Sequence, residues 1–144
     1  MTRDAAEIAQ ASADAMWAED NASRAMGMKI EKVGPGLAVL SMSVGVNMVN
    51  GHGLCHGGYI FSLADSAFAF ACNSHSQRHV AQHCQISYLA PGRLGMRLIA
   101  EARERHRGER SGLYDVTVRS EAGEVIAEFR GHSRSIPGTL VAEA

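Results

Sequence analysis

Cysteine and long apolar runs are both scarce in this sequence, and each shortage excludes a class of protein. Three cysteines among 144 residues cannot form a disulfide framework, which favours a reducing compartment. No apolar run reaches the roughly 18 residues that a membrane-spanning helix needs. The N-terminus, MTRDAAEIAQ, lacks the apolar stretch of a secretory signal. We therefore expect a cytoplasmic protein with no membrane partner.

An excess of one charge is missing as well. The 14 Lys and Arg against 15 Asp and Glu give a net charge of -1, so the chain lacks the basic footprint of a nucleic-acid binder. We expect no nucleic-acid partner. A hydrophobic content of 46% excludes a disordered chain, and the length suits one domain with a sizeable core. Because repeats and linkers are absent, we predict a single domain over residues 1–144, with an N-terminal helical extension over 1–24.

The first part of the chain changes from helical to strand periodicity. Residues 4–22 are rich in Ala, and their apolar spacing predicts a lead-in helix with a weak apolar stripe. The residues of this stripe are Ile8, Ala11, Ala15 and Met16. Apolar and polar residues then alternate over 28–33 and 36–44, on either side of a Gly-Pro-Gly turn. This pattern predicts a β-hairpin.

The most apolar stretch, GYIFSLADSAFAFACN, begins at Gly58. It is too long for one buried strand, so it predicts a helix over about 57–73, apolar on nearly every face and therefore buried. Four strands separated by turn-forming dipeptides follow, over 79–89, 94–106, 111–120 and 124–134. The predicted fold class is α+β, with a hairpin and a strand meander wrapped as an antiparallel sheet around one central buried helix. The edge strands of such a sheet favour oligomerisation.

Two features of the predicted central helix point to chemistry. Gly57 and Gly58 open its first turn, where N–H groups have no helical partner and the helix dipole is positive. Such a terminus can act as an oxyanion hole for a carbonyl that becomes tetrahedral. Asp65 is the only charged residue from Gly57 to Gln77, and a buried carboxylate without partners is costly. Either a neighbouring strand satisfies Asp65, or it is a nucleophile or general base.

Other polar residues nearby have weaker claims. The Asn50 amide can hold a carbonyl or a water, although a loop Asn commonly forms a turn. His52, Cys55 and His56 lie close together, but a metal site needs three or four ligands and no second pair follows, so we predict no metal. We expect His56 to order the loop. Ser66 either contacts a substrate or bonds back to the preceding helical turn.

Several known motifs are absent. The sequence has no G-x-S-x-G elbow for a serine nucleophile, no P-loop and no dinucleotide fingerprint. The arginines between residues 103 and 110 alternate with glutamates, which is typical of a solvated strand face. Arginines there can also bind a phosphate-bearing ligand.

The segment NGHGLCHGGYIFSLADSAFAFACN resembles the signature of the hot-dog-fold acyl-CoA thioesterases. It is most similar to the phenylacetic-acid-degradation subfamily, whose members carry a similar asparagine, HGG and LAD arrangement. The resemblance extends over about residues 25–135 and includes YLAPG, GLYD and FRG. It implies hydrolysis of an acyl-CoA thioester to free acid and coenzyme A. A phenylacetyl or ring-hydroxylated phenylacetyl group is the expected acyl group.

The family implies roles for single residues. Gly57 matches the glycine whose N–H polarises the thioester carbonyl, and Asp65 matches the catalytic carboxylate. Asn50 matches the asparagine that holds the thioester or the attacking water. His56 matches the histidine that supports the loop, and Gly58 completes the glycine pair. In this family Asp65 of one subunit faces Asn50 and Gly57 of the other, two dimers commonly form a tetramer, and no cofactor is needed because coenzyme A is part of the substrate.

Two positions depart from the family pattern. Relatives often place a Ser or Thr on the strand that faces the catalytic Asp, whereas this strand reads VAQHCQ, so Gln82 is the expected substitute. Ala90 stands where some relatives carry a basic residue, so no contact to the phosphates of coenzyme A is assigned. The shape of the acyl pocket is expected to depend on packing by Phe61, Phe68, Tyr88 and the partner subunit.

Two alternatives to a thioesterase remain open. A non-catalytic acyl-CoA binding module would keep Gly57 but would not need an ionisable Asp65. A hydratase or dehydratase of the same fold needs a His paired with an acid, and His56 with Asp65 imitates that pair.

Overall fold

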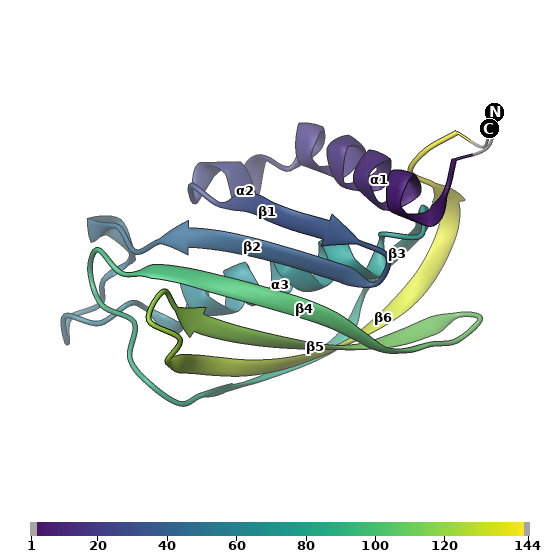
Figure 1. The fold of residues 1–144 in the computed structure, drawn as a ribbon. Coiled ribbons are helices and arrows are strands. Elements are labelled where there is room, and N and C mark those ends of the chain that lie inside the picture. Colours follow the sequence, from purple (N-terminus) through teal and green to yellow (C-terminus); the bar gives the residue numbers. More distant parts are fainter. Residues whose placement is uncertain (1–2, 143–144) are drawn as a thin grey trace.

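The computed structural model describes residues 3–142, in which one antiparallel sheet curls around a helix. Its strands are β1 (Lys29–Gly34), β2 (Leu37–Ser43), β3 (Gln77–Tyr88), β4 (Arg97–Arg107), β5 (Ser111–Ser120) and β6 (Val125–Thr139), and the enclosed helix is α3 (Gly57–Cys72). The six strands lie in the order β1-β2-β4-β5-β6-β3, and α3 lies in the hollow of the curled sheet (Figure 1). The predicted α+β class, with an antiparallel sheet wrapped around one helix, is confirmed.

The position of β3 differs from the predicted meander, which is wrong at this point. β4 pairs with β2, whereas β3 pairs with β6 at the far edge of the sheet. The chain reaches that edge because α3 carries it along the hollow, and residues 89–96 then return it to β4. Alternation of apolar and polar residues identifies a strand but does not name its neighbour. Pro91 and Gly92 therefore belong to a crossing loop rather than to a hairpin turn.

One side of α3 fills the core between the helix and strands β2, β4 and β5. Its buried residues are Ile60, Leu63, Ala64, Ala67, Phe68, Phe70, Ala71 and Cys72. The Phe68 ring lies against Gly131 of β6, where an added Cβ would meet the ring at 2.8 Å. The packing at this contact therefore has no room for a side chain at position 131.

The other side of α3 is not fully covered by this chain. Exposed or half-buried residues recur along this side at helical spacing, at Gly58, Ser62, Asp65 and Ala69. The prediction that this helix is buried on nearly every face is therefore wrong for these four residues, as far as a single chain is concerned. The alanines and glycines made the whole helix look apolar, although the sheet curls closely around only one side of it.

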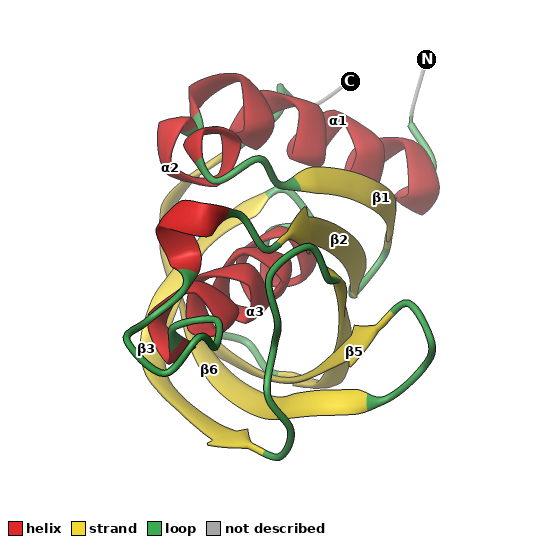
Figure 2. Cartoon of the chain, turned by 90° about the vertical axis from the view of Figure 1, so that its left-hand side faces the viewer, coloured by secondary structure: helices red, strands yellow, loops and turns green. Residues whose placement is uncertain are grey.

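The N-terminal extension forms two helices, α1 (Ala5–Glu19) and α2 (Asn21–Ala25), rather than the one predicted over 4–22. Asp20 separates them because its backbone is not helical and its carboxylate accepts a hydrogen bond from Ser23 N at 2.9 Å, which caps α2. α1 packs on β1 at the edge of the sheet, and both helices contact α3 (Figure 2). No helix within residues 3–142 is long and apolar enough to cross a membrane.

The face that α1 buries is shifted from the predicted stripe. The buried residues of α1 are Ala9, Ser12 and Ala13, with Met16 and Trp17 partly buried against the core. Ala9, Ala13 and Trp17 are four residues apart, and the Trp17 ring packs on Phe70 of α3 with centroids 6.2 Å apart. The largest side chain of the helix thus determines which side faces the core.

Candidate active site

The loop before α3 is held in shape by Asn50. The side-chain Oδ1 of Asn50 accepts hydrogen bonds from His52 N at 2.9 Å and from Leu54 N at 3.1 Å. The backbone N of Asn50 donates to Leu54 O at 2.7 Å. Asn50 therefore forms the turn that is common for a loop asparagine. Its Nδ2 donor has no hydrogen bond to any described residue.

Two further backbone hydrogen bonds fix this loop to its surroundings. Cys55 N donates to Gly92 O in the crossing loop at 2.9 Å, and His56 N donates to Met48 O at 2.7 Å. An added Cβ on Gly92 would lie 3.0 Å from Cys55 Cβ, so the two segments are in close contact. The first turn of α3 thus starts from a position that the loops on both sides define.

His56 is the N-cap of α3. Its ring Nδ1 accepts a hydrogen bond from Gly58 N at 2.9 Å, and an added Cβ on Gly58 would lie 3.0 Å from the same ring atom. The N–H of Gly57, the first residue of the helix, has no hydrogen-bond partner within residues 3–142. A free N–H in the first turn of a helix, where the helix dipole is positive, attracts a partly negative oxygen.

A cavity of about 430 Å³ lies in front of this helix terminus. Its lining comes from the loop, from the first turn of α3 and from residues 88–92 after β3, and is formed by Asn50, Leu54, Cys55, Gly57, Ile60, Tyr88, Leu89, Ala90, Pro91 and Gly92. Most of these residues are apolar, and Asn50 and Gly57 add two of the few polar groups. This combination is typical of a pocket that binds an apolar group and orients one polar atom.

Asp65 lies two turns further along α3, on its half-buried stripe. Its carboxylate has no hydrogen bond and no ion pair to any residue between 3 and 142, and burial raises its pKa above the ordinary value of 3.8. The charge of Asp65 acts on two nearby thiols. Burial, and then the Asp65 charge, raise the pKa of both Cys72 and Cys84. The alternative in which a strand satisfies Asp65 is not what the structure shows.

Asp65 and Gly57 are too far apart to act together within one chain. Eight residues of α-helix span about 12 Å along the axis, at about 1.5 Å per residue. The structure therefore brings together Asn50, His56, Gly57 and Gly58, whereas Asp65 lies apart from them on the same helix.

Ser66 and Gln82 also lie apart from the cavity. The Ser66 hydroxyl is 2.8 Å from Ser23 Oγ, so it joins α3 to α2. Gln82 lies at an irregularity of β3, between the paired residues Ala81 and His83, and is exposed without a hydrogen bond to a described residue. Its suggested contact to the catalytic carboxylate stays a prediction.

The aromatic residues expected to shape the pocket divide into two groups. Tyr88 lines the cavity, but Phe68 is buried between Tyr114 and Phe129, and Phe61 packs edge-on against Phe129 at 5.3 Å. Phe61 and Phe68 therefore do not line this cavity, and their part in a pocket that includes the partner subunit stays a prediction. The spacing of seven residues between Phe61 and Phe68 indicates that both lie on one face of the helix. It does not indicate whether that face contacts the core or a cavity.

Two contacts next to the predicted site residues were not expected from the sequence. Tyr88 Oη donates to Gly57 O at 2.9 Å, and Cys84 is close enough to Asp65 for the two to interact electrostatically. Cys84 belongs to the strand segment VAQHCQ, which was expected to face Asp65. In a regular strand the alternation of side chains places Cys84 and Gln82 on the same face, and this was the only signal in the sequence for Cys84.

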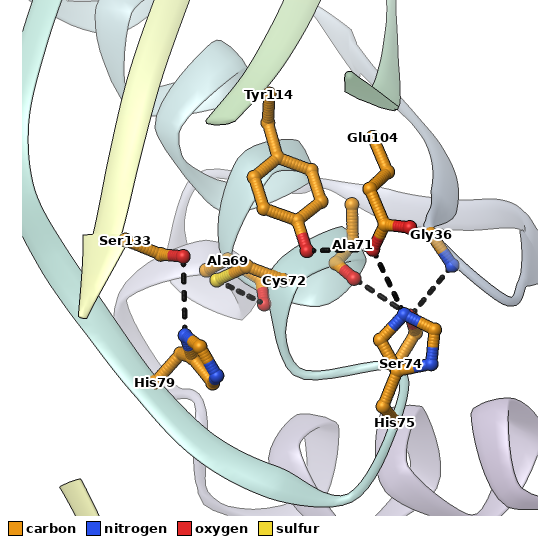
Figure 3. Close-up of polar contacts among 10 residues, drawn as sticks. All are labelled: Gly36, Ala69, Ala71, Cys72, Ser74, His75, His79, Glu104, Tyr114 and Ser133. Atoms are coloured by element: carbon orange, nitrogen blue, oxygen red, sulfur yellow. Dashed lines mark hydrogen bonds and ion pairs between the residues drawn. The ribbon is translucent and has the colours of Figure 1, made fainter. Parts of the chain in front are cut away.

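A second polar cluster lies at the carboxyl end of α3 (Figure 3). Glu104 Oε1 accepts from Tyr114 Oη at 2.8 Å and lies 2.9 Å from His75 Nε2. Beside it, Ser74 Oγ donates to Ala71 O and accepts from Gly36 N. Burial tends to raise the pKa of Glu104, but the hydrogen bonds with His75 and Tyr114 outweigh it and lower that pKa. Every polar group of this cluster has a partner, as expected for structural contacts.

The comparisons with known proteins agree with this geometry. The family model described as Thioesterase superfamily matches residues 52–127. The acyl-coenzyme A thioesterase PaaI of Escherichia coli strain K12 is 45% identical over 132 residues, which is 92% of this chain and 94% of that protein. The solved structure of the E. coli PaaI protein from the phenylacetic acid degradation operon has a TM-score of 0.93 at 43% identity, over 94% of this chain and 99% of that chain. A Streptococcus mutans protein solved with bound acetyl-CoA has a TM-score of 0.75 at 26% identity, over 78% of this chain and 90% of that chain.

A thioesterase of the hot-dog fold is thus the class that fold and site define. The chain belongs to the thioesterase superfamily, in the subfamily of the phenylacetic-acid-degradation acyl-CoA thioesterases. The predicted resemblance and the predicted enzyme class are confirmed. In the part of the chain that the structure describes, no three His, Cys, Asp or Glu side chains gather as a metal site.

Proposed function

We propose that this protein hydrolyses an aryl-acetyl-CoA thioester, of the phenylacetyl or ring-hydroxylated phenylacetyl type, to the free acid and coenzyme A. The observation that carries the proposal is the free Gly57 N–H at the start of α3, in a cavity that it shares with Asn50. A thioester carbonyl is already electrophilic, so one donor at its oxygen and one carboxylate are sufficient equipment.

In the proposed reaction the thioester oxygen accepts a hydrogen bond from Gly57 N–H, which stabilises the negative charge that develops there. As a nucleophile, Asp65 forms a C–O bond to the carbonyl carbon while the C–S bond breaks, and water hydrolyses the resulting mixed anhydride. As a general base, Asp65 takes a proton from the water that attacks the same carbon, and coenzyme A leaves as the thiol. Asn50 Nδ2, free of other partners, holds the carbonyl or that water.

The reaction requires a second copy of the chain, because Asp65 and Gly57 are about 12 Å apart along α3. β3 has 12 residues and is paired along one side, with β6, so its other side presents unpaired backbone groups. Val80 and Tyr88 are exposed along it. A homodimer that pairs β3 with the β3 of its partner completes both sites, with Asp65 of one subunit facing Asn50 and Gly57 of the other. We propose a tetramer built from two such dimers.

A hydratase is less compatible with the geometry than a thioesterase. The Nδ1 atom of His56 accepts from Gly58 N, so one ring nitrogen already serves as the helix cap.

Thiol release from a panel of acyl-CoA esters tests the proposed activity. The panel contains phenylacetyl-CoA, a ring-hydroxylated phenylacetyl-CoA, benzoyl-CoA and two straight-chain acyl-CoAs, each with the wild type and with Asp65→Asn. We expect fastest turnover with a phenylacetyl ester and dependence on Asp65 throughout. No thiol release from a folded protein that binds coenzyme A would favour the acyl-CoA binding module instead.

Subunit mixing tests whether the site spans two chains. A hybrid of an Asp65→Asn subunit and an Asn50→Ala subunit has one intact site, formed by Asp65 of the second chain and Asn50 of the first. Random dimers are half hybrids with one of two sites intact, so co-expression restores about a quarter of the wild-type activity. If the mixture is no more active than the average of its two parents, each site lies within one chain.

A further inference from the structure

Tyr88, the last residue of β3, lies directly against the first turn of α3. Its hydroxyl donates to Gly57 O at 2.9 Å. An added Cβ on Gly57 would lie 2.9 Å from Tyr88 Cζ and 3.0 Å from Tyr88 Oη. Real Cβ atoms do not tolerate a contact of this length in a packed structure, so the ring occupies the space that a side chain at position 57 would need.

The sheet fixes the position of this tyrosine. Tyr88 pairs with Ala127 of β6, and the next two residues donate their N–H groups to Ile126 O at 2.8 and 3.2 Å. The side chain is 51% exposed and lines the cavity beside Asn50 and Gly57. The ring therefore forms a wall of the cavity that is anchored to the sheet and not to the loop.

The direction of the hydrogen bond is informative. In a helix the N–H groups point towards the amino end and the carbonyl groups point towards the carboxyl end. A hydrogen bond to Gly57 O therefore restrains the residue that carries the free N–H without occupying that N–H. Burial raises the pKa of Tyr88 above its ordinary value of 10.0, so the hydroxyl remains a donor at neutral pH.

We infer that Tyr88 is a positioning residue, which holds Gly57 N–H in the place where it receives the thioester oxygen. This inference rests on the proposed function, in which that N–H is the oxyanion donor. It also gives a reason for the glycine. Every residue except proline has a backbone N–H, so the chemistry alone does not demand glycine at position 57, whereas a Cβ there would displace the Tyr88 ring.

Tyr88→Phe tests the hydrogen bond while it keeps the ring. We expect kcat/KM to fall about 2- to 10-fold, the range for loss of one hydrogen bond, with the melting temperature nearly unchanged. Tyr59→Phe is the matched control, because Tyr59 belongs to the same helical turn and its hydroxyl has no hydrogen bond to a described residue. Equal kcat/KM in the wild type and in both variants would overturn the inference.

Two unreactive analogues distinguish positioning from general packing. In the first, a CH₂ group replaces the thioester sulfur and the carbonyl remains. In the second, a thioether, the carbonyl is absent. We expect Tyr88→Phe to weaken inhibition by the ketone 2- to 10-fold, as it lowers kcat/KM, and to leave inhibition by the thioether unchanged. Equal weakening of both would show a packing role only.

A double-variant cycle tests the steric part. Gly57→Ala keeps the N–H but collides with the Tyr88 ring, so we expect at least about a tenfold loss of kcat/KM. Tyr88→Ala removes the ring, and Gly57→Ala/Tyr88→Ala should then be no less active than Tyr88→Ala alone, because no clash remains. Losses that multiply would mean that the two residues act independently.

The outcome for Asp65 separates this inference from the proposed function. If Asp65→Asn abolishes turnover while Tyr88→Phe has wild-type kcat/KM and wild-type affinity for the ketone, the positioning role fails and the thioesterase mechanism stands. Full turnover by a folded Asp65→Asn protein overturns the proposed mechanism whatever Tyr88 does.

Discussion

At its amino end α3 meets a loop that leaves the Gly57 N–H and the Asn50 Nδ2 group without a partner among the described residues, whereas at its carboxyl end it meets side chains that satisfy one another. Two carboxylates near the helix differ in the same way, Asp65 in the middle of α3 and Glu104 beside its carboxyl end. Asp65 has no donor and burial raises its pKa, while Glu104 has His75 and Tyr114 beside it and its pKa is lowered.

This difference separates groups that hold the fold from groups that are available for a ligand. An unpaired polar group in a partly buried place costs free energy, and a paired one does not. The carboxyl end therefore contributes to stability, and the amino end, together with Asp65, retains unsatisfied groups at that cost. The same helix thus carries both kinds of region, one at each end.

The largest expected effect is at Asp65. Asp65→Asn should lower kcat at least about a hundredfold, because the nucleophile or general base is lost. The melting temperature should stay the same or rise, since an unpaired, half-buried charge is removed. Thiol-release kinetics and thermal unfolding measure the two effects. If Asp65→Asn lowers the stability and leaves turnover unchanged, Asp65 is a structural residue and not a catalytic one.

At the carboxyl end the loss should appear in stability and not in turnover. Glu104→Ala leaves the fully buried Tyr114 hydroxyl without its acceptor, which costs about 1–3 kcal/mol of unfolding free energy. Urea unfolding measures this cost, and Tyr114→Phe/Glu104→Ala is the control because it leaves no orphaned hydroxyl. A folded Glu104→Ala enzyme with a kcat as low as that of Asp65→Asn would place this cluster in the active site.

The two carboxylates should respond to acid with opposite signs. The pKa of Glu104 is lowered from its ordinary 4.5, so the stability it contributes is present above that value and is lost as the pH falls through its folded pKa. The pKa of Asp65 is raised from 3.8, so its destabilising effect disappears as the pH falls through its own folded pKa, where turnover also falls.

Unfolding of the wild type, Glu104→Gln and Asp65→Asn from neutral pH to pH values below both ordinary carboxyl pKa values checks these signs. The advantage of the wild type over Glu104→Gln should shrink on acidification. The deficit of the wild type relative to Asp65→Asn should shrink as well. A deficit that grows in acid would mean that Asp65 gains a partner in the folded protein.

The smallest expected effect is at Ser66, next to Asp65. Ser66→Ala removes the hydrogen bond to Ser23 and should cost about 1 kcal/mol of stability without changing kcat or KM. Ser62→Ala is the control, because that hydroxyl bonds back to Gly58 O in its own helix. A raised KM in Ser66→Ala alone would return Ser66 to the substrate site.

Much of the candidate site could be predicted from the sequence because it is local. The glycine pair, His56 and Asn50 lie within nine residues, and helix geometry alone places Gly57 at an open N-terminus. The resemblance added the role of Asp65. The contact between Tyr88 and Gly57 could not be found this way, because Tyr88 approaches from the end of a strand 31 residues away.

The sequence by itself determined where helices and strands form, because apolar spacing and turn residues act over a few neighbours. It did not determine that β3 lies beside β6, that α1 turns Ala9 and Ala13 inward, or that one stripe of α3 stays uncovered. Those outcomes depend on which surfaces meet and exclude water together. The same reason applies to the two carboxylates. Their charge is written in the sequence, but only the tertiary structure supplied donors to Glu104 and left Asp65 without them.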